Sequence, residues 1–272
     1  MNTCIVCPPR SKSFWHMRGR LIKSMVDAGV TVVFLLPRDA GFDEESASLN
    51  RRGYKVHSAP FVRDRIAFFS TILYCLQLTL MCIKYKPTAV LGFTFKPIVI
   101  CSFVGFLFQV KNRIGIFTGL GSALGNALEK MGRKSKYLKF LLKILFTFCT
   151  KIIVQNDCDK ALVSQFCKDM SKLVKVNGSG VNLERFSYSD SPELPVKFLY
   201  VGRFTKSKGL LDLMGAYLLL AKDNLEFELI LVGDQGPDNE IPRALIEDYN
   251  QGHITVHKFT PSIEKYIVGS HV

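Results

Sequence analysis

Apolar, β-branched runs alternate with segments of helical periodicity along most of the chain, and this alternation constrains the fold more than any other feature. Several of the runs are apolar at every position, which is typical of strands buried on both faces of a parallel sheet. The pattern predicts an α/β protein with a doubly wound sheet. We expect strands at 3–7, 30–36, 55–59, 89–93, 113–117, 151–154 and 173–176, and helices near 14–28, 44–52, 66–85, 98–108, 129–149 and 157–167.

A short polar segment broken by two prolines, residues 187–195, separates this region from a second series of the same kind. Its composition is that of a linker, so we expect two Rossmann-like domains, 1–188 and 189–272. Three βα units form only part of such a sheet, so we expect the second domain to be incomplete and the chain to be truncated at its C-terminal end. The second series has expected strands at 198–201, 227–232 and 254–259 and expected helices at 210–220 and 241–249.

Positive charge is concentrated in the first domain. Residues 1–188 carry 28 basic and 11 acidic side chains, a net charge of +17, whereas residues 189–272 carry 8 and 12, a net charge of −4. This asymmetry indicates an anionic partner for the first domain: nucleic acid, a phospholipid surface or a phosphorylated ligand. We do not expect nucleic acid, because no recognised nucleic-acid motif accompanies the charge.

Residues 129–149 combine six basic side chains with an apolar, aromatic-rich face at helical spacing. That composition is typical of helices lying in a membrane interface. The alternative is that the apolar face packs on the sheet while the lysines are merely solvated. Both interpretations stay open at this point.

Residues 66–83 contain no charged side chain and are just long enough to span a bilayer. Four polar residues interrupt the stretch, so we favour a long helix buried against the sheet. No targeting segment opens the chain, and we expect the protein to begin in the cytosol.

The chain has eight cysteines. A zinc site would need a second cysteine pair at ligand spacing besides Cys4 and Cys7, and the sequence has none. We expect buried free thiols in a reducing compartment. Cys4 and Cys7 lie three apart on one expected strand, so their side chains should face opposite sides of the sheet. The five histidines likewise form no metal-spaced group, and only His16, beside the first expected strand, is a candidate acceptor contact.

The segment 201–209 places Arg203 at the carboxyl end of a strand and Lys208 at the entry of the next helix. Ligands bind at the carboxyl ends of strands in open α/β sheets, and a helix N-terminus offers free N–H groups to a phosphate. A bidentate Arg and a point-charge Lys would together hold a diphosphate. The alternative is two solvated cations in a loop. The spacing is not that of a P-loop.

Two glycine-rich loops, 119–125 and 177–182, follow expected strands. The first approximates a dinucleotide fingerprint with one extra residue. A dehydrogenase would place an acidic residue at the end of the next strand, where this chain has Gln155 and Asn156, so we reject that function. Each loop either lets the backbone approach a ligand or only turns tightly.

In their order and spacing, these segments resemble a bacterial family 4 retaining glycosyltransferase of the two-domain GT-B fold. The resemblance is to the branch that extends polyprenyl-diphosphate-linked or surface-polysaccharide sugars. It covers essentially the whole chain. The matching segments are 17–21, 93–97, 118–122, 154–156, 178–182, 185–186, 201–203, 208–209 and 231–237.

The resemblance implies transfer of a hexose or N-acetylhexosamine from a UDP-sugar to a polyprenyl-diphosphate-linked glycan, with retention, on the cytoplasmic face of the membrane. Arg203 and Lys208 would hold the diphosphate and stabilise its developing charge without a metal or other cofactor. The implied nucleotide contacts are Gly202, Gly233, Asp234 and Gly236. The implied acceptor contacts, in the first domain, are Arg18, Gly19, Lys96, Gly119, Gly121 and Ser122.

The chain departs from the family pattern at one point. The family carries an acidic motif, two Glu about two helical turns apart, after a strand that would begin just beyond Val272. The chain given ends before that motif. The alternative is therefore an inactive truncated remnant that acts at most as a membrane-associating module.

Overall fold

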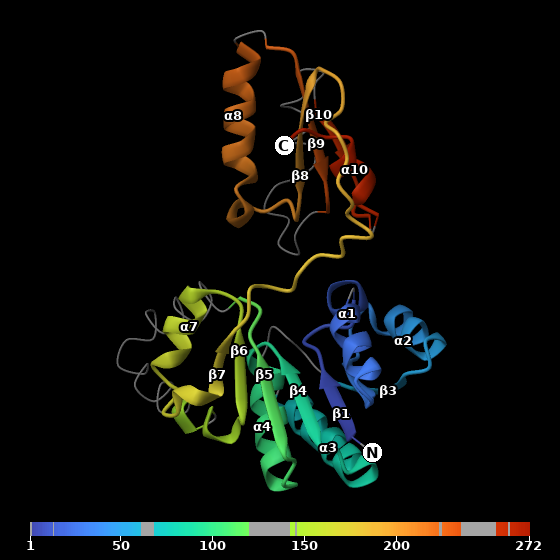
Figure 1. The fold of residues 1–272 in the computed structure, drawn as a ribbon, viewed down its shortest axis with the longest axis vertical. Coiled ribbons are helices and arrows are strands. Elements are labelled where there is room, and N and C mark those ends of the chain that lie inside the picture. The colour runs from blue at the N-terminus through green and yellow to red at the C-terminus, as the bar shows by residue number, and fades with distance from the viewer. Residues whose placement is uncertain are drawn as a thin grey trace. The chain divides into compact units, whose positions relative to one another are not determined.

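The structure of the protein is a computed structural model that describes residues 2–12, 14–60, 68–119, 142–144, 146–222, 225–234, 254–260 and 262–272. The chain divides into two compact units, Met1–Gly180 and Val181–Val272. Each contains one parallel sheet (Figure 1).

The sheet of the first unit has seven strands in the order β3-β2-β1-β4-β5-β6-β7, and every neighbouring pair is parallel. The order reverses beside β1, as in a doubly wound fold, so the carboxyl ends of all strands share one edge. The strands are β1 (Asn2–Cys7), β2 (Val30–Pro37), β3 (Lys55–Ala59), β4 (Ala89–Phe93), β5 (Asn112–Ile116), β6 (Lys151–Val154) and β7 (Leu173–Lys175).

Helices cover both faces of this sheet, and successive residues of β1 show why (Figure 1). Cys4 and Val6 pack in the cluster with α1 and α2, whereas Ile5 and Cys7 pack in the cluster with α3 and α4. The predicted strands, apolar on both faces, are confirmed, and Cys4 and Cys7 face opposite sides. The helices are α1 (Phe14–Asp27), α2 (Phe42–Arg51), α3 (Phe68–Tyr85), α4 (Phe95–Leu107) and α7 (Asp157–Ser164), with the 3-10 turn η2 (Met170–Lys172).

The expected helix at 129–149 falls mostly outside the described residues; 142–144 and 146–148 within it are helical. In the described part, Leu142 and Phe146 are buried in the core of the first unit, whereas Ile144 is exposed. The membrane-facing interpretation stays a prediction. The expected helix at 241–249 lies wholly outside the described residues.

The second unit has a three-stranded parallel sheet in the order β10-β9-β8. Its core forms where Leu210, Met214 and Tyr217 of one helix pack on Leu229 and Leu231 of the central strand. The elements are β8 (Val196–Val201), the 3-10 turn η3 (Lys206–Lys208), α8 (Leu210–Lys222), β9 (Phe227–Val232), β10 (Ile254–His257) and α10 (Glu264–Val268).

The two units divide at residue 180, eight residues before the expected boundary at 188. The reason is that residues 185–191, which include the start of the expected linker, contact the second unit. Arg185 forms an ion pair with Glu264, with 2.8 Å between Nη2 and Oε2. Residues 187–191 line a cavity of about 440 Å³ together with His271 and Val272.

Helix α3 lies on the sheet through Tyr74, Leu78, Met81 and Cys82, which are all buried. The expected helix against the sheet is thus confirmed for the described residues 68–83. Its outer face is exposed, so the helix is buried on one side only. Within the described ranges, no helix has the length and apolar character needed to cross a bilayer.

All eight cysteines lie within the described residues, and all are free thiols, of which only Cys158 is exposed. Burial raises the pKa of Cys4 and Cys82 to about 12 and that of Cys149 to about 11.

Because the thiolate is the reactive form, we expect a single fast-reacting thiol in the folded protein near pH 8. Kinetics of labelling with a disulfide reagent measure this, and Cys158→Ser should remove the fast phase. A second fast phase in that variant would contradict the burial.

Candidate functional site

Among the described residues, the sequence-predicted site residues that come together do so beside the carboxyl edge of one sheet or the other, and each edge is taken separately. At the edge of the first unit, Arg18 of α1 donates a hydrogen bond from Nη1 to the hydroxyl of Ser179. Gln155, just after β6, donates to the same hydroxyl over 3.1 Å. Residues from α1, from the end of β6 and from the loop after β7 are thus joined through one oxygen atom.

Arg18 is half-buried, and burial lowers the pKa of its guanidinium. Its Cζ lies 5.9 Å from the centroid of the Phe93 ring at the end of β4. The Arg18 guanidinium lies near the Phe93 ring and donates one hydrogen bond to Ser179. Its other N–H groups can donate to an acidic ligand. This is the arrangement expected for a group that binds phosphate or carboxylate oxygens.

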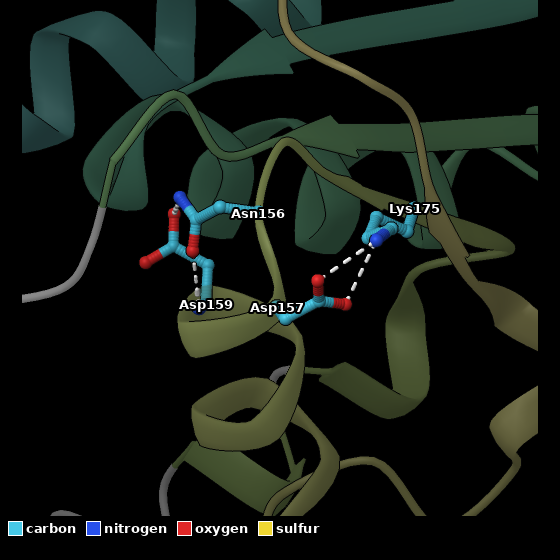
Figure 2. A network of polar contacts seen from close by, with 4 residues as sticks. All are labelled: Asn156, Asp157, Asp159 and Lys175. Atoms are coloured by element: carbon cyan, nitrogen blue, oxygen red, sulfur yellow. Dashed lines mark hydrogen bonds and ion pairs between the residues drawn. The ribbon is translucent and has the colours of Figure 1, made fainter.

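A polar network fixes the strand ends beside this cluster (Figure 2). Asn156 caps α7 by accepting a hydrogen bond from the backbone N–H of Asp159 over 2.7 Å, and its amide donates to the buried Asp159 carboxylate over 3.0 Å. Lys175 of β7 contacts both carboxylate oxygens of Asp157 at 2.9 Å and lowers the pKa of that carboxyl. The network therefore holds the backbone that follows Gln155.

The turn after β4 is strained. Thr94 adopts φ 62° and ψ 170°, a region that is nearly restricted to glycine, although its side chain is β-branched. The turn is also tight, because a Cβ added at Gly92 would lie 2.8 Å from the backbone of Ile98. Lys96, in the first turn of α4 and half-buried, follows directly after this junction.

The strain at Thr94 can be tested by comparing the stabilities of a glycine and an alanine variant, because the strain should reverse their usual order. At an ordinary position glycine is about 0.5–1 kcal/mol less stable than alanine. At position 94 we expect Thr94→Gly to be more stable than Thr94→Ala, by about 1–2 kcal/mol, because only glycine adopts this backbone without strain. Urea unfolding of the two variants measures the difference. If the alanine variant is the more stable one, the backbone at Thr94 is not strained.

At the edge of the second unit, Arg203 follows β8 and Lys208 ends the turn η3, immediately before α8. Both side chains are exposed. Neither forms an ion pair with a carboxylate of the described residues. The backbone that carries them is fixed, since the hydroxyl of Tyr200 donates to the carbonyl of Arg203 over 2.7 Å. Gly209, at φ 71°, then turns the chain into α8.

The loops after β8 and β9 interlock at two glycines. A Cβ added to Gly233 would lie 1.9 Å from the carbonyl oxygen of Gly202. The Gly202 N–H donates to Val232 over 3.1 Å, and the Phe204 N–H donates to the carbonyl of Asp234 over 3.0 Å. Gly202, Gly233 and Asp234 therefore come together beside Arg203, as a site built on strand ends requires.

The remaining predicted residues divide into three cases. Gly121, Ser122 and Gly236 lie outside the described residues. Gly119 is exposed with φ 112°, a conformation that suits glycine alone. Gly19 is buried, and a Cβ there would lie 2.8 Å from the Trp15 ring, so packing within α1 accounts for this glycine. A substrate role for each of them stays a prediction.

Sequence reasoning missed four residues of these edges as site residues: Thr94, Gln155, Ser179 and Tyr200. Positive φ at a threonine leaves no signal in the sequence. Tyr200 reads as an ordinary strand residue, and only the fold shows that its hydroxyl holds the Arg203 loop. The exposed His16 makes no hydrogen bond or ion pair that supports a site role within the described part of the chain.

Sequence comparison identifies one informative relative. The chain is 28% identical over 203 residues to the capsular polysaccharide biosynthesis glycosyltransferase CapM of Staphylococcus aureus, a match that covers 69% of this chain and 51% of CapM. The chain thus spans about half the length of this curated relative. A scan against protein-family models gives no match.

Solved structures show the fold. The crystal structure of HepE from Anabaena, in complex with UDP and glucose, matches 99% of this chain and 72% of its own length with a TM-score of 0.70 at 10% identity. The structure of the UDP-GlcNAc 2-epimerase of Methanocaldococcus jannaschii matches 98% of this chain and 76% of its own length, with a TM-score of 0.61 at 9% identity. The predicted fold class, α/β of the GT-B type, is confirmed, and the second unit is small. Because an epimerase shares it, the fold does not by itself select the reaction.

Proposed function

We propose that this chain, which has the GT-B-like fold and is related to the capsular polysaccharide glycosyltransferase CapM, is a glycosyltransferase of capsular or surface-polysaccharide biosynthesis. In this proposal it moves a hexose or N-acetylhexosamine from a UDP-sugar to a lipid-linked acceptor, with retention of configuration. The second unit binds the donor and the first binds the acceptor. The protein acts in the cytoplasm, at the inner face of the cytoplasmic membrane.

The proposal that the second unit binds the UDP-sugar donor rests on one observation. Arg203 and Lys208 stand exposed and without a carboxylate partner among the described residues, on a loop tied to Gly233 and Asp234 at the carboxyl edge of a parallel sheet. Nucleotides bind at such edges, and the N-terminus of α8 adds free N–H groups there. The diphosphate of UDP fits two cations and these donors.

In the reaction, the bond between the anomeric carbon and the diphosphate breaks, and the acceptor hydroxyl oxygen bonds to the same carbon. Its proton passes to the departing diphosphate, on whose oxygens negative charge grows. Arg203 would contact two of these oxygens at once, whereas Lys208 would act as a point charge. Both cations stabilise the leaving group more than the intact donor, which lowers the barrier.

The acceptor half rests on the cluster at the edge of the first unit. The Arg18 guanidinium and the Gln155 amide are both donors, and they meet at Ser179. Such a cluster suits an acceptor that carries diphosphate, as a polyprenyl-diphosphate-linked glycan does. Asn156 caps α7 and so fixes the backbone next to Gln155, whose amide is one of the two donors.

The proposal is tested by incubating the purified protein with labelled UDP-sugars and a membrane extract. We expect UDP release together with label in the lipid-linked fraction, and an anomeric configuration equal to that of the donor by NMR. Isomerised UDP-sugar without UDP release would instead indicate an epimerase. UDP binding by calorimetry without release or extension would favour the inactive remnant, and absence of both binding and transfer would reject the proposal.

A further inference from the structure

The outer face of α3 carries an exposed apolar stripe. Six large apolar side chains on it have 46–80% of their surface exposed: Phe69, Ile72, Leu73, Leu76, Leu80 and Ile83. We call these six residues the α3 stripe. They recur every three or four positions, so they lie within about 100° of helix circumference and extend over roughly 20 Å. The opposite side of the same helix packs on the sheet.

Single exposed apolar residues are ordinary, but a continuous stripe of six marks a surface that contacts something other than water. The inner face of α3 already supplies the core contacts through Tyr74, Leu78 and Met81. Burial within the first unit therefore does not require the stripe to be apolar.

The charged side chains of the segment that contains the α3 stripe indicate which kind of partner the stripe contacts. The described segment 68–119, which contains α3, carries five basic side chains and no acidic one. Lys84 and Lys86, at the C-terminal end of α3, are exposed, as is Lys111 after α4. A second copy of this chain would present the same cations, and this segment offers no carboxylate to pair with them. An anionic bilayer supplies both an apolar interior and phosphate groups.

We infer that the α3 stripe docks on an anionic membrane surface, with α3 lying in the plane of the interface and Lys84 and Lys86 at the lipid headgroups. This inference rests on the proposed association with the membrane and is independent of the transfer reaction. The contact inferred here lies on α3, whereas residues 129–149, the sequence-based candidate, lie mostly outside the described residues.

Vesicle flotation tests the inference. We expect the protein to float with vesicles containing 30% phosphatidylglycerol and to bind phosphatidylcholine vesicles more weakly. Leu76→Gln/Leu80→Gln should lower binding by at least about tenfold, because two anchoring side chains leave the apolar layer. Leu211→Gln/Leu219→Gln is the matched control, since it changes two exposed leucines on α8 of the second unit, and it should bind like the wild type.

The electrostatic part has its own variant. Lys84→Gln/Lys86→Gln should weaken binding to the anionic vesicles by roughly tenfold or more at low salt and should change binding to neutral vesicles little. A gain-of-signal experiment complements these losses. Tryptophan fluorescence from Leu76→Trp should be quenched by brominated lipid, whereas that from Leu219→Trp should not.

Three outcomes would overturn the inference. Leu76→Gln/Leu80→Gln could float as well as the wild type, which would place membrane contact elsewhere on the protein. The wild type could fail to bind anionic vesicles, which would reject membrane association while leaving UDP-sugar transfer to its separate assay. Light scattering could show a dimer that the same two substitutions dissociate, which would make a second copy the partner of the stripe.

Discussion

Replacing Arg203 by alanine is expected to slow sugar transfer by about 100-fold or more, with little effect on stability. The side chain is exposed, so its removal leaves no cavity. Its backbone is held by the Tyr200 hydroxyl, so the loop keeps its position in the variant. The loss therefore measures the charge stabilisation that the guanidinium gives to the leaving diphosphate. Initial rates of UDP release at saturating UDP-sugar are the measurement.

Two further variants separate geometry from charge. Arg203→Lys keeps the charge but loses the bidentate contact, so its rate should fall between those of the wild type and the alanine variant. Lys222→Ala removes an exposed cation from the other end of α8 and should leave the rate unchanged. A near-normal rate for Arg203→Ala would remove this residue from the donor site.

Most of the strand framework could be predicted from the sequence because it depends on local composition. Residues 55–59, 89–93 and 227–232 were predicted with the bounds they have in the structure. Runs of β-branched residues between turn signals define such strands without tertiary information. The ends of helices were less well predicted: α4 begins at Phe95, three residues before the expected start, because the strained Thr94 turn follows β4 directly.

The two faces of α3 show where sequence reasoning stops. An uncharged run of this length is compatible with a buried helix, a membrane span or a helix with one free face. Periodicity cannot separate these cases when both faces are apolar. Only the packing of α3 on the sheet distinguishes them, because it buries Tyr74 and Leu78 and leaves Leu76 and Leu80 exposed.

The candidate site divides in the same way. The placement of Arg203 after a strand and of Lys208 before a helix could be predicted, because strand ends and helix starts are visible in the sequence. Their binding role stays a prediction. The contact between Gly202 and Gly233 could not be predicted, since it joins residues 31 positions apart through two different loops. The Ser179 hydroxyl, which joins Arg18 and Gln155, depends on strand order for the same reason.

Replacing Gly233 by alanine is expected to destabilise the second unit by about 1–3 kcal/mol, as overpacking does elsewhere. The added Cβ would lie 1.9 Å from the carbonyl oxygen of Gly202, which is a backbone atom and cannot rotate away. Hydrogen bonds fix both loops, because the Gly202 N–H donates to Val232 and the Gly233 N–H to His257. The loops must therefore separate, and the separation displaces Arg203. Hydrogen exchange of the β8 and β9 amides should become faster, and UDP binding should weaken.

A second glycine provides the control with the opposite sign. Gly215 lies inside α8, and a Cβ added there meets no atom within 4 Å. Gly215→Ala should therefore stabilise the unit by about 0.5–1 kcal/mol, because alanine favours the helix interior. The two substitutions add the same methyl group, so opposite shifts in urea unfolding isolate the contact between the loops. If Gly233→Ala is as stable as the wild type and binds UDP equally well, the interlocked loops do not shape the donor site.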